Sequence, residues 1–500
     1  MKKNNLNSPL QTPLSPLNDY QCYLDLALEQ AVKIGVDYAD IRIQKTCSER
    51  IFLENISFKH NLQSIIFGYG IRVLKDGAWG FAHSNIFTKD AFKKTVKKAL
   101  EIAKFSAKLK KGTGIRLAQE KSYLAQYQTP YKKDPFQIPL KEKVELMLEV
   151  SKTMLNYQDI KKTTVFFYSQ KDDKLFGSTL GTRLEIGTVH INPMLTAYAM
   201  NNNDMQSRQF DEGGRATGWE WIDDLNLLHI ADRVAQEAMI KVNAETLGEE
   251  KRRTLILDHG HLGLTMHESV GHPTELDRVL GWEADYAGIS FATPEKLNNY
   301  KYGSPIVNFM GDNTLEGGLA TNGFDDDGVP GQKWFIIKDG ILNEYGTTRE
   351  TAPFIGLDYS RGCNRATYYY DQPFNRIPNL YLLPGKEQCS LSDLIRDTKD
   401  GIYIQGRGSF SIDQHRVNFQ FGGDYFWEIK EGKLFRPLKK VLYRSHNPEF
   451  WNSCDAICDK RFWKPFGVIN CGKGQPNQTG RMTHGAAPAR FRNIRVGGSK

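Results

Sequence analysis

The sequence feature that most constrains the fold is a pair of histidines, His267 and His272, in a segment with the pattern of a short apolar helix. Residues 254–257 predict a buried strand, Gly260 interrupts it, and apolar residues at helical spacing follow. Five positions along an ideal α-helix place two side chains about 140° apart. An undistorted helix therefore cannot direct both imidazoles at one metal ion, whereas a π-bulge, or a helix that ends between them, can.

The neighbours of His272 favour such a departure from regular geometry. Gly271 is permissive, and Pro273 disfavours continuation of a regular helix. Glu268 completes the pattern HExxxH, which is one residue longer than the zinc peptidase pattern HExxH. In the shorter pattern the two histidines share a helix face and the glutamate is the general base. The longer pattern therefore predicts a metal site with an acidic side chain beside it.

HExxxH followed by Glu275 and Asp277 resembles the TldD/PmbA family of metallopeptidases, and in particular its catalytic, TldD-type subunit. The resemblance is strong over roughly residues 250–500 and looser over 20–245. It also rests on five segments closer to the C-terminus, which are DDDGVPGQ at 325–332, YLLPG at 381–385, DGIY at 400–403, FQFGG at 419–423 and NCGKGQP at 470–476.

The resemblance implies that a cysteine near the C-terminus, here Cys471, is the third metal ligand. Two imidazoles and a thiolate leave an open fourth position on zinc, which is the catalytic arrangement. Glu268 is then suited to take the proton of an attacking water. The sequence around Cys471 is too polar and glycine-rich for a core thiol. No acidic residue follows Asp459, whereas nine Lys or Arg residues do, and such positive charge favours a thiolate.

The groups close to this motif allow two interpretations each. Glu275 and Asp277 either orient a ligand histidine through its other ring nitrogen or form the acidic first turn of a helix that begins at Pro273. His259 and His261 either contact the metal ligands from behind or are turn residues packed near the site.

Two further clusters can be interpreted either as metal sites or as residues without a metal-binding role. The acidic run 325–327 can be a calcium site or a turn, and the lack of EF-hand spacing favours the turn. Cys454 and Cys458 form a CxxxC pattern without an evident second ligand pair, which favours free thiols over a second metal site.

Composition excludes several classes of protein. A net charge of +8 over 500 residues, without a concentrated basic stripe, does not call for nucleic acid. The sequence has no apolar run of about 18 residues, so we expect no membrane span. The N-terminus has no apolar segment typical of a secretory signal. Seven scattered cysteines are typical of free thiols in a reducing compartment, and we expect a cytoplasmic protein.

The pattern of elements predicts an α+β fold. Residues 1–18 are proline-rich and polar, and we expect a disordered tail. Residues 19–245 alternate helical segments with strands and predict an N-terminal α/β domain with antiparallel strands. Residues 246–500 are rich in short strands separated by Gly, Asp and Pro turns, which predicts a C-terminal metallopeptidase domain built on a large antiparallel sheet or barrel that carries the metal helix.

The resemblance implies a zinc-dependent peptidase that hydrolyses short or unfolded peptides. It also implies a dimer, either with a PmbA (TldE)-type subunit that lacks the motif or with a second copy of the chain. Two alternatives remain: a metal enzyme that modifies a peptide in a natural-product pathway, and a non-catalytic peptide-binding subunit. The intact Glu268 argues against the second alternative.

Overall fold

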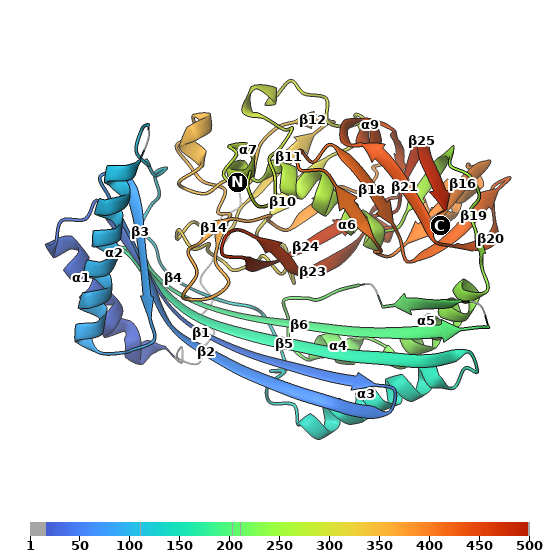
Figure 1. Cartoon of the computed structure of the whole chain (residues 1–500), viewed down its shortest axis with the longest axis horizontal. Helices are drawn as coiled ribbons and strands as arrows, with labels where there is room; N and C mark the ends of the chain where they lie inside the picture. Colours follow the sequence, from blue (N-terminus) through green and yellow to red (C-terminus); the bar gives the residue numbers. More distant parts are fainter. Residues whose placement is uncertain (1–16, 111, 203, 211, 499–500) are drawn as a thin grey trace.

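The structure, a computed structural model, describes residues 17–110, 112–202, 204–210 and 212–498 (Figure 1). It confirms the α+β fold predicted from the sequence: a long curved sheet with helices forms the N-terminal half, and shorter strands form the C-terminal half. The predicted tail lies outside the described residues except for residues 17 and 18. No helix in the described ranges has the length and apolar character that a membrane span requires.

A seven-stranded sheet forms the N-terminal half, in the order β3-β2-β1-β5-β6-β4, with β7 also paired to β6. Four of its strands are 17 to 19 residues long and run the length of the molecule (Figure 1). The strands are β1 Tyr38–Glu54, β2 Ser57–Lys75, β3 Ala78–Ser84, β4 Leu124–Gln128, β5 Ile160–Ser178, β6 Arg183–Met200 and β7 Met205–Gln209.

The polar centre of β5 makes the strand longer than its sequence predicts. We expect two strands, 163–169 and 173–178, because polar residues separate them, but the structure shows one continuous strand. The Asp172 carboxylate accepts hydrogen bonds from Gln44 and Thr46 of β1, so the polar stretch stays within the ladder. The two strands expected over 183–200 likewise form the single strand β6.

Helices cover the two ends of this sheet. Near one end, α1 (Gln21–Lys33) and α2 (Lys89–Leu109) pack in one hydrophobic cluster, and near the other end α3 (Leu140–Leu155) and α5 (Leu227–Val242) pack in a second (Figure 1). A short helix, α4 (Glu220–Asp224), precedes α5. The Thr88 side chain caps α2 by accepting a hydrogen bond from the backbone N–H of Ala91.

The C-terminal half contains two larger sheets, and both mix parallel with antiparallel pairs. The ten-stranded sheet has the order β17-β18-β21-β25-β9-β16-β19-β20-β8, with β22 paired to β25, and the six-stranded sheet has the order β12-β11-β10-β15-β24-β23. Among the described residues neither closes into a barrel, so the prediction of one antiparallel sheet or barrel is correct only in its dominant strand direction.

The strands of the ten-stranded sheet are β8 Glu245–Thr246, β9 Lys251–Leu257, β16 Asp400–Gln405, β17 Phe410–Ile412, β18 Asn418–Gly422, β19 Tyr425–Lys430, β20 Lys433–Lys439, β21 Val441–His446, β22 Cys454–Ile457 and β25 Ala489–Gly498. Those of the six-stranded sheet are β10 Phe309–Asp312, β11 Lys333–Lys338, β12 Ile341–Leu342, β15 Leu380–Leu382, β23 Lys464–Lys473 and β24 Gln478–Ala486. The remaining elements are the β13 Asn364–Arg365 and β14 Phe374–Asn375 pair, and the helices α6 His259–Met266, α7 Leu276–Val279, α8 Leu391–Arg396 and α9 Asn447–Asn452.

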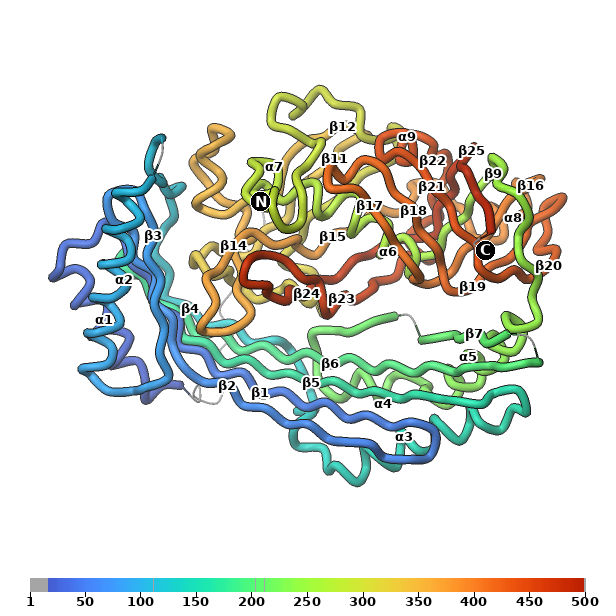
Figure 2. Tube along the Cα trace, viewed as in Figure 1, coloured from blue at the N-terminus to red at the C-terminus, as the bar shows by residue number. Residues whose placement is uncertain are grey.

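The β23–β24 hairpin lies over the long strands of the N-terminal sheet (Figure 2). Arg481 of β24 donates a hydrogen bond to the Tyr168 hydroxyl of β5 at 3.0 Å. The two halves of the molecule therefore meet directly behind the strand that carries Cys471.

The acidic loop, defined as residues 325–327, fastens the two halves together. Asp326 forms ion pairs with Lys174 and with Arg42, and Asp327 pairs with Arg72 at 2.8 Å. Gly328 follows the loop with φ of +77°, as a turn requires. The turn interpretation therefore fits the backbone, and basic side chains already pair with Asp326 and Asp327.

Candidate functional site

The HExxxH segment follows β9 as a helix that changes type at the first histidine. Asp258 caps α6 by accepting a hydrogen bond from the backbone of His261 at 2.7 Å. Residues His267–Gly271 form a π-helix, and His272–Thr274 form a 3₁₀ turn. The wider π turn absorbs the extra residue of the motif, so the two imidazole centroids lie only 4.7 Å apart. Of the two departures that the sequence left open, the structure shows the π turn.

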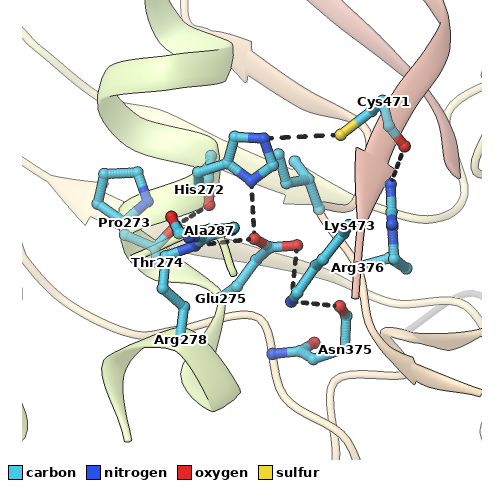
Figure 3. Close-up of polar contacts among 12 residues, drawn as sticks. His272, Pro273, Thr274, Glu275, Arg278, Ala287, Asn375, Arg376, Cys471 and Lys473 are labelled. Atoms are coloured by element: carbon cyan, nitrogen blue, oxygen red, sulfur yellow. Dashed lines mark hydrogen bonds and ion pairs between the residues drawn. The ribbon is translucent and has the colours of Figure 1, made fainter. Parts of the chain in front are cut away.

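Glu275 and Cys471 lie at opposite nitrogens of the His272 ring (Figure 3). The Glu275 carboxylate accepts a hydrogen bond from Nδ1 at 2.8 Å, and Nε2 lies 3.6 Å from the Cys471 Sγ atom. Because a carboxylate only accepts, Nδ1 carries the proton and the Nε2 lone pair faces the thiol. The orientation interpretation of Glu275 therefore fits this geometry.

His267 is held in the same tautomer by a second histidine. Its Nδ1 lies 2.7 Å from Nε2 of His484, whose own Nδ1 lies 3.3 Å from the Leu380 carbonyl oxygen. The carbonyl only accepts, so His484 donates from Nδ1 and accepts at Nε2. His267 therefore donates from Nδ1 and keeps the lone pair of its Nε2 for a metal ion.

The donor set of His267, His272 and Cys471 fits a zinc ion. One ligand atom from each residue lies within 4.8 Å of the others, and all three residues are buried. A nitrogen and a sulfur bound to one tetrahedral zinc lie about 3.6 Å apart, which is the separation between His272 Nε2 and Cys471 Sγ.

The electrostatics of the three groups also suit metal binding. Burial lowers the pKa of both imidazoles, which keeps them neutral. Burial alone would raise the pKa of the Cys471 thiol, but His272 and Arg376 outweigh it, and the net pKa lies below that of an ordinary thiol.

Asp277 is linked to the candidate ligand His272 indirectly, through Lys473 and Glu275. Its two carboxylate oxygens accept hydrogen bonds from the Lys473 ammonium at 2.7 and 2.8 Å. Lys473 also lies 3.2 Å from Glu275 and donates to the Asn375 carbonyl at 2.7 Å. Asp277 therefore holds Lys473. Lys473 in turn holds the carboxylate that orients His272 (Figure 3).

The Glu268 carboxylate is buried and forms an ion pair with Arg416. Arg416 has a φ of +63° and lies between β17 and β18. Its guanidinium also donates to the Ala287 carbonyl at 3.2 Å, and Asn447 holds its backbone oxygen at 3.0 Å. The carboxylate next to the candidate metal ligands is therefore fixed by a residue 148 positions away.

The other histidines and cysteines considered from the sequence lie outside this group. His261 is buried, and its two ring nitrogens lie 2.9 Å from the Gly406 carbonyl and 2.9 Å from the Tyr443 hydroxyl. Burial lowers its pKa to about 4, so it is a neutral structural side chain. His259, Cys454 and Cys458 are not part of the metal-binding group that the described residues form.

Sequence reasoning missed four residues that support the site: Lys473, His484, Arg416 and Arg376. Lys473 is the one with a local signal, because residues two apart in a strand share a face and Lys473 follows Cys471 by two. His484, Arg416 and Arg376 come from other segments, and no spacing in the sequence links them to the motif.

Comparison with known proteins supports a peptidase site. Three family models match the chain: PmbA/TldA metallopeptidase domain 1 over residues 39–103, the central domain over 133–242 and the C-terminal domain over 250–498. A metalloprotease of Methanocaldococcus jannaschii is 30% identical over 446 residues, which are 89% of this chain and 94% of that protein. A zinc metalloprotease TldD homolog of Saccharolobus solfataricus is 21% identical, over 94% of this chain and 99% of its own length.

Solved structures share the fold at low sequence identity. A protein of Thermotoga maritima described as a modulator of DNA gyrase superposes with a TM-score of 0.77 at 18% identity, over 95% of this chain and 100% of its own. TldE from Thermococcus kodakarensis superposes with a TM-score of 0.73 at 15% identity, over 94% of this chain and 100% of its own. These likenesses concern the arrangement of elements alone.

Proposed function

Because this chain belongs to the PmbA/TldD family of metallopeptidases, we propose that it is a zinc-dependent peptidase of the TldD type that hydrolyses short or unfolded peptides. One observation carries the proposal. His267, His272 and Cys471 bring three ligand atoms together, and the buried Glu268 carboxylate belongs to the same π turn.

The proposed chemistry divides between the metal and the chain. A bound zinc ion supplies a Lewis acid that polarises the scissile carbonyl and lowers the pKa of a water molecule. Glu268 accepts a proton from the attacking water and returns it to the leaving amine. Arg416 fixes the Glu268 carboxylate, and the Glu275–Lys473–Asp277 chain fixes His272, so both groups are positioned before the substrate binds.

The six-stranded sheet supports an extended substrate. Its terminal strand is β23, which carries Cys471 and pairs with β24 on one side, and no other described strand pairs with its second edge. A peptide added to that edge would be held by main-chain hydrogen bonds beside a metal ligand, with little dependence on its side chains. A folded domain cannot offer such a segment, so we expect the substrate to be short or unfolded.

We also propose that the active assembly is a dimer, either with a PmbA/TldE-type subunit or with a second copy of this chain. The likeness of this fold to TldE supports the idea that the two kinds of subunit can form equivalent halves of one particle. A dimer that encloses the site would admit an extended peptide and exclude compact proteins.

The experiment that tests the function combines metal analysis with peptide digestion. We expect about one zinc per chain, cleavage of unstructured peptides, and no cleavage of a stable folded protein at equal concentration. The digestion is repeated with a candidate partner subunit while light scattering records the assembly state. A zinc-loaded, correctly assembled protein that cleaves no peptide would contradict the proposed activity, and cleavage of the folded protein by a monomer would contradict the enclosure.

A further inference from the structure

Beside the metal site lies a second cavity, of about 350 Å³, that the proposed chemistry does not use. We call it the side pocket. It lies next to α7 and the turn between β23 and β24. Its charged lining residues are all acidic: Asp277, Glu283, Asp285 and Glu350. Among the described residues no lysine, arginine or histidine lines it.

Three residues that line the side pocket each have a buried side-chain oxygen atom without a hydrogen-bond partner. These atoms are Oε2 of Glu283, Oδ1 of Asn364 and Oδ1 of Asn375, on residues that are 9%, 3% and 1% exposed. Both asparagine orientations are fixed, because each Nδ2 donates at 2.7 Å, Asn364 to Asp327 and Asn375 to the Gly346 carbonyl. All three orphaned atoms are therefore acceptors, and a buried acceptor without a donor costs free energy.

The acidic groups of the side pocket differ in how well they are compensated. Lys473 forms an ion pair with Asp277, whereas no basic side chain among the described residues forms an ion pair with Glu283 or Glu350. Burial raises the pKa of Glu283, and it raises the pKa of Glu350 to about 7. A positive charge in the cavity would favour the ionised form of both carboxyls.

Aromatic side chains complete the wall. Trp282, Tyr286 and Phe374 line the cavity, and Trp282 and Tyr286 are each 44% exposed. Aromatic faces attract ammonium and guanidinium groups in addition to the acidic charges. A compact metal site does not fit, because His267, His272 and Cys471 are the only group of three close metal ligands that the described residues form. The chemistry therefore points to an organic cation.

The side pocket is coupled to the metal site through two of its own lining residues. The Asp277 carboxylate binds the Lys473 ammonium, which lies two residues after Cys471 on the same strand. The Asn375 carbonyl binds the same ammonium (Figure 3). We propose that the side pocket binds the positively charged group of a peptide substrate, either the free amino terminus or the side chain of a lysine or arginine. This inference rests on the proposed peptidase function and adds a charge preference to it.

The test compares matched peptides that carry one lysine, scanned through each position, with peptides in which norleucine replaces that lysine. Each peptide is used with a free and with an acetylated amino terminus, so that the two sources of charge are separated. For the wild-type zinc-loaded assembly we expect kcat/KM to be at least about tenfold higher when the cation is present at one defined position. Equal kcat/KM for charged and uncharged peptides at every position would overturn the proposal.

Variants locate the preference in the side pocket. Glu283→Gln keeps the shape of the side chain but removes its charge, and we expect the ratio of the two kcat/KM values to fall toward one. Asp285→Lys changes an exposed residue at the rim, where folding is not at risk, and should shift the preference toward uncharged peptides. The control Glu316→Gln, at an exposed carboxyl that does not line the side pocket, should keep the wild-type ratio. An unchanged ratio in Glu283→Gln and Asp285→Lys would refute the assignment.

Direct binding separates this inference from the peptidase proposal. Calorimetry with Glu268→Gln protein and zinc measures peptide affinity without turnover. Tighter binding of the cationic peptide supports the side pocket even if the wild type hydrolyses nothing. Hydrolysis without any difference in affinity or rate would sustain the peptidase and reject the charge preference.

Discussion

Each candidate metal ligand is held by a partner that fixes which atom it presents. Glu275 holds His272, His484 holds His267, and Arg376 donates to the Cys471 carbonyl oxygen. Each chain of hydrogen bonds ends at a group that can only accept or only donate a hydrogen bond. The positions of the protons on the two histidines are therefore fixed. No tautomer is left free, and the ligand atoms are set before a metal arrives.

Loss of the thiol should remove the metal. We predict that Cys471→Ala binds zinc at least about tenfold more weakly than the wild type, because a three-ligand site becomes a two-ligand site. Inductively coupled plasma mass spectrometry after dialysis measures the bound zinc. Cys363→Ala is the matched control, since that thiol is buried but lies outside the metal-binding group. Full zinc occupancy in Cys471→Ala would exclude the thiol as a ligand.

Loss of the Glu268 carboxylate should greatly slow peptide hydrolysis while leaving zinc binding intact. We predict that Glu268→Gln keeps its zinc but hydrolyses peptides at least about a hundredfold more slowly, because an amide cannot accept the proton of water. Metal content and kcat are measured on the same preparation. Near-normal turnover would mean that another group is the base, with Glu275 and Asp277 the nearest carboxyls to test.

At the scale of the element, the π-helix allows two histidines five residues apart to face the same candidate metal position. Its last residue, Gly271, is packed so closely that a Cβ atom there would lie 2.9 Å from Cδ1 and 3.1 Å from Cγ2 of Ile377. Because Gly271 has right-handed helical backbone angles, with φ of −58°, the π turn depends on this glycine for space rather than for backbone freedom.

Filling that space should strain the metal helix. We predict that Gly271→Ala lowers the free energy of unfolding by about 1–3 kcal/mol, as overpacking in a core does, and weakens zinc binding as His272 shifts. Adding Ile377→Val removes the nearest methyl group and should recover part of both losses. Chemical denaturation and zinc titration of the single and double variants give the answer. Stability equal to that of the wild type in Gly271→Ala would show that the turn tolerates a Cβ.

Local signals account for the elements that the sequence predicts well. The hairpin turns at Asp76–Gly77, Asp339–Gly340 and Glu431–Gly432 all have positive φ at both residues, and a polar residue followed by glycine predicts that geometry. Other boundaries are not marked locally. Alternating apolar and polar residues predict strands over 341–347 and 206–217, but the strands end at Leu342 and Gln209. At both places the chain leaves the ladder although the partner strand, β11 or β6, continues.

The site residues also fall into two groups: those that the local sequence predicts and those that only the tertiary fold brings to the site. His267, Glu268 and His272 follow from one short pattern, and Cys471 follows from the family resemblance. Arg416 and His484 reach the site only through the tertiary fold, from a loop after β17 and from β24. Nothing in their own neighbourhoods distinguishes them from ordinary surface or core residues.

At the scale of the whole molecule, charged groups hold together two halves that have separate apolar cores. The core of the C-terminal half is distinct from the two larger clusters of the N-terminal half. A small third cluster on β5 and β6 packs against Phe324 of the C-terminal half. Between the two halves, Arg72 binds Asp40 of its own half and Asp327 of the other, and Lys241 binds Asp424 at 2.7 Å. Buried ion pairs of this kind fix one relative orientation better than apolar contacts, which can slide.

Breaking this contact should loosen the molecule between its halves. We predict that Arg72→Met lowers the free energy of unfolding by about 3–5 kcal/mol, because Asp40 and Asp327 are left buried and uncompensated. Urea denaturation measures the loss, and limited proteolysis shows whether cleavage falls between the halves. Arg116→Met, at an exposed position of the N-terminal half, is the control. A loss no larger than that of the control would show that the buried pair does not hold the halves.

The separation of the candidate ligands along the chain has a consequence in time. His272 and Cys471 lie 199 residues apart, and His484 follows later still. A ribosome that adds about 5–20 residues per second needs roughly 10–40 seconds to pass from one to the other. During that interval the growing chain is itself an unfolded polypeptide, yet it has no complete set of ligands. If the chain digests unfolded peptides as proposed, it is therefore inactive for as long as its own synthesis leaves it unfolded.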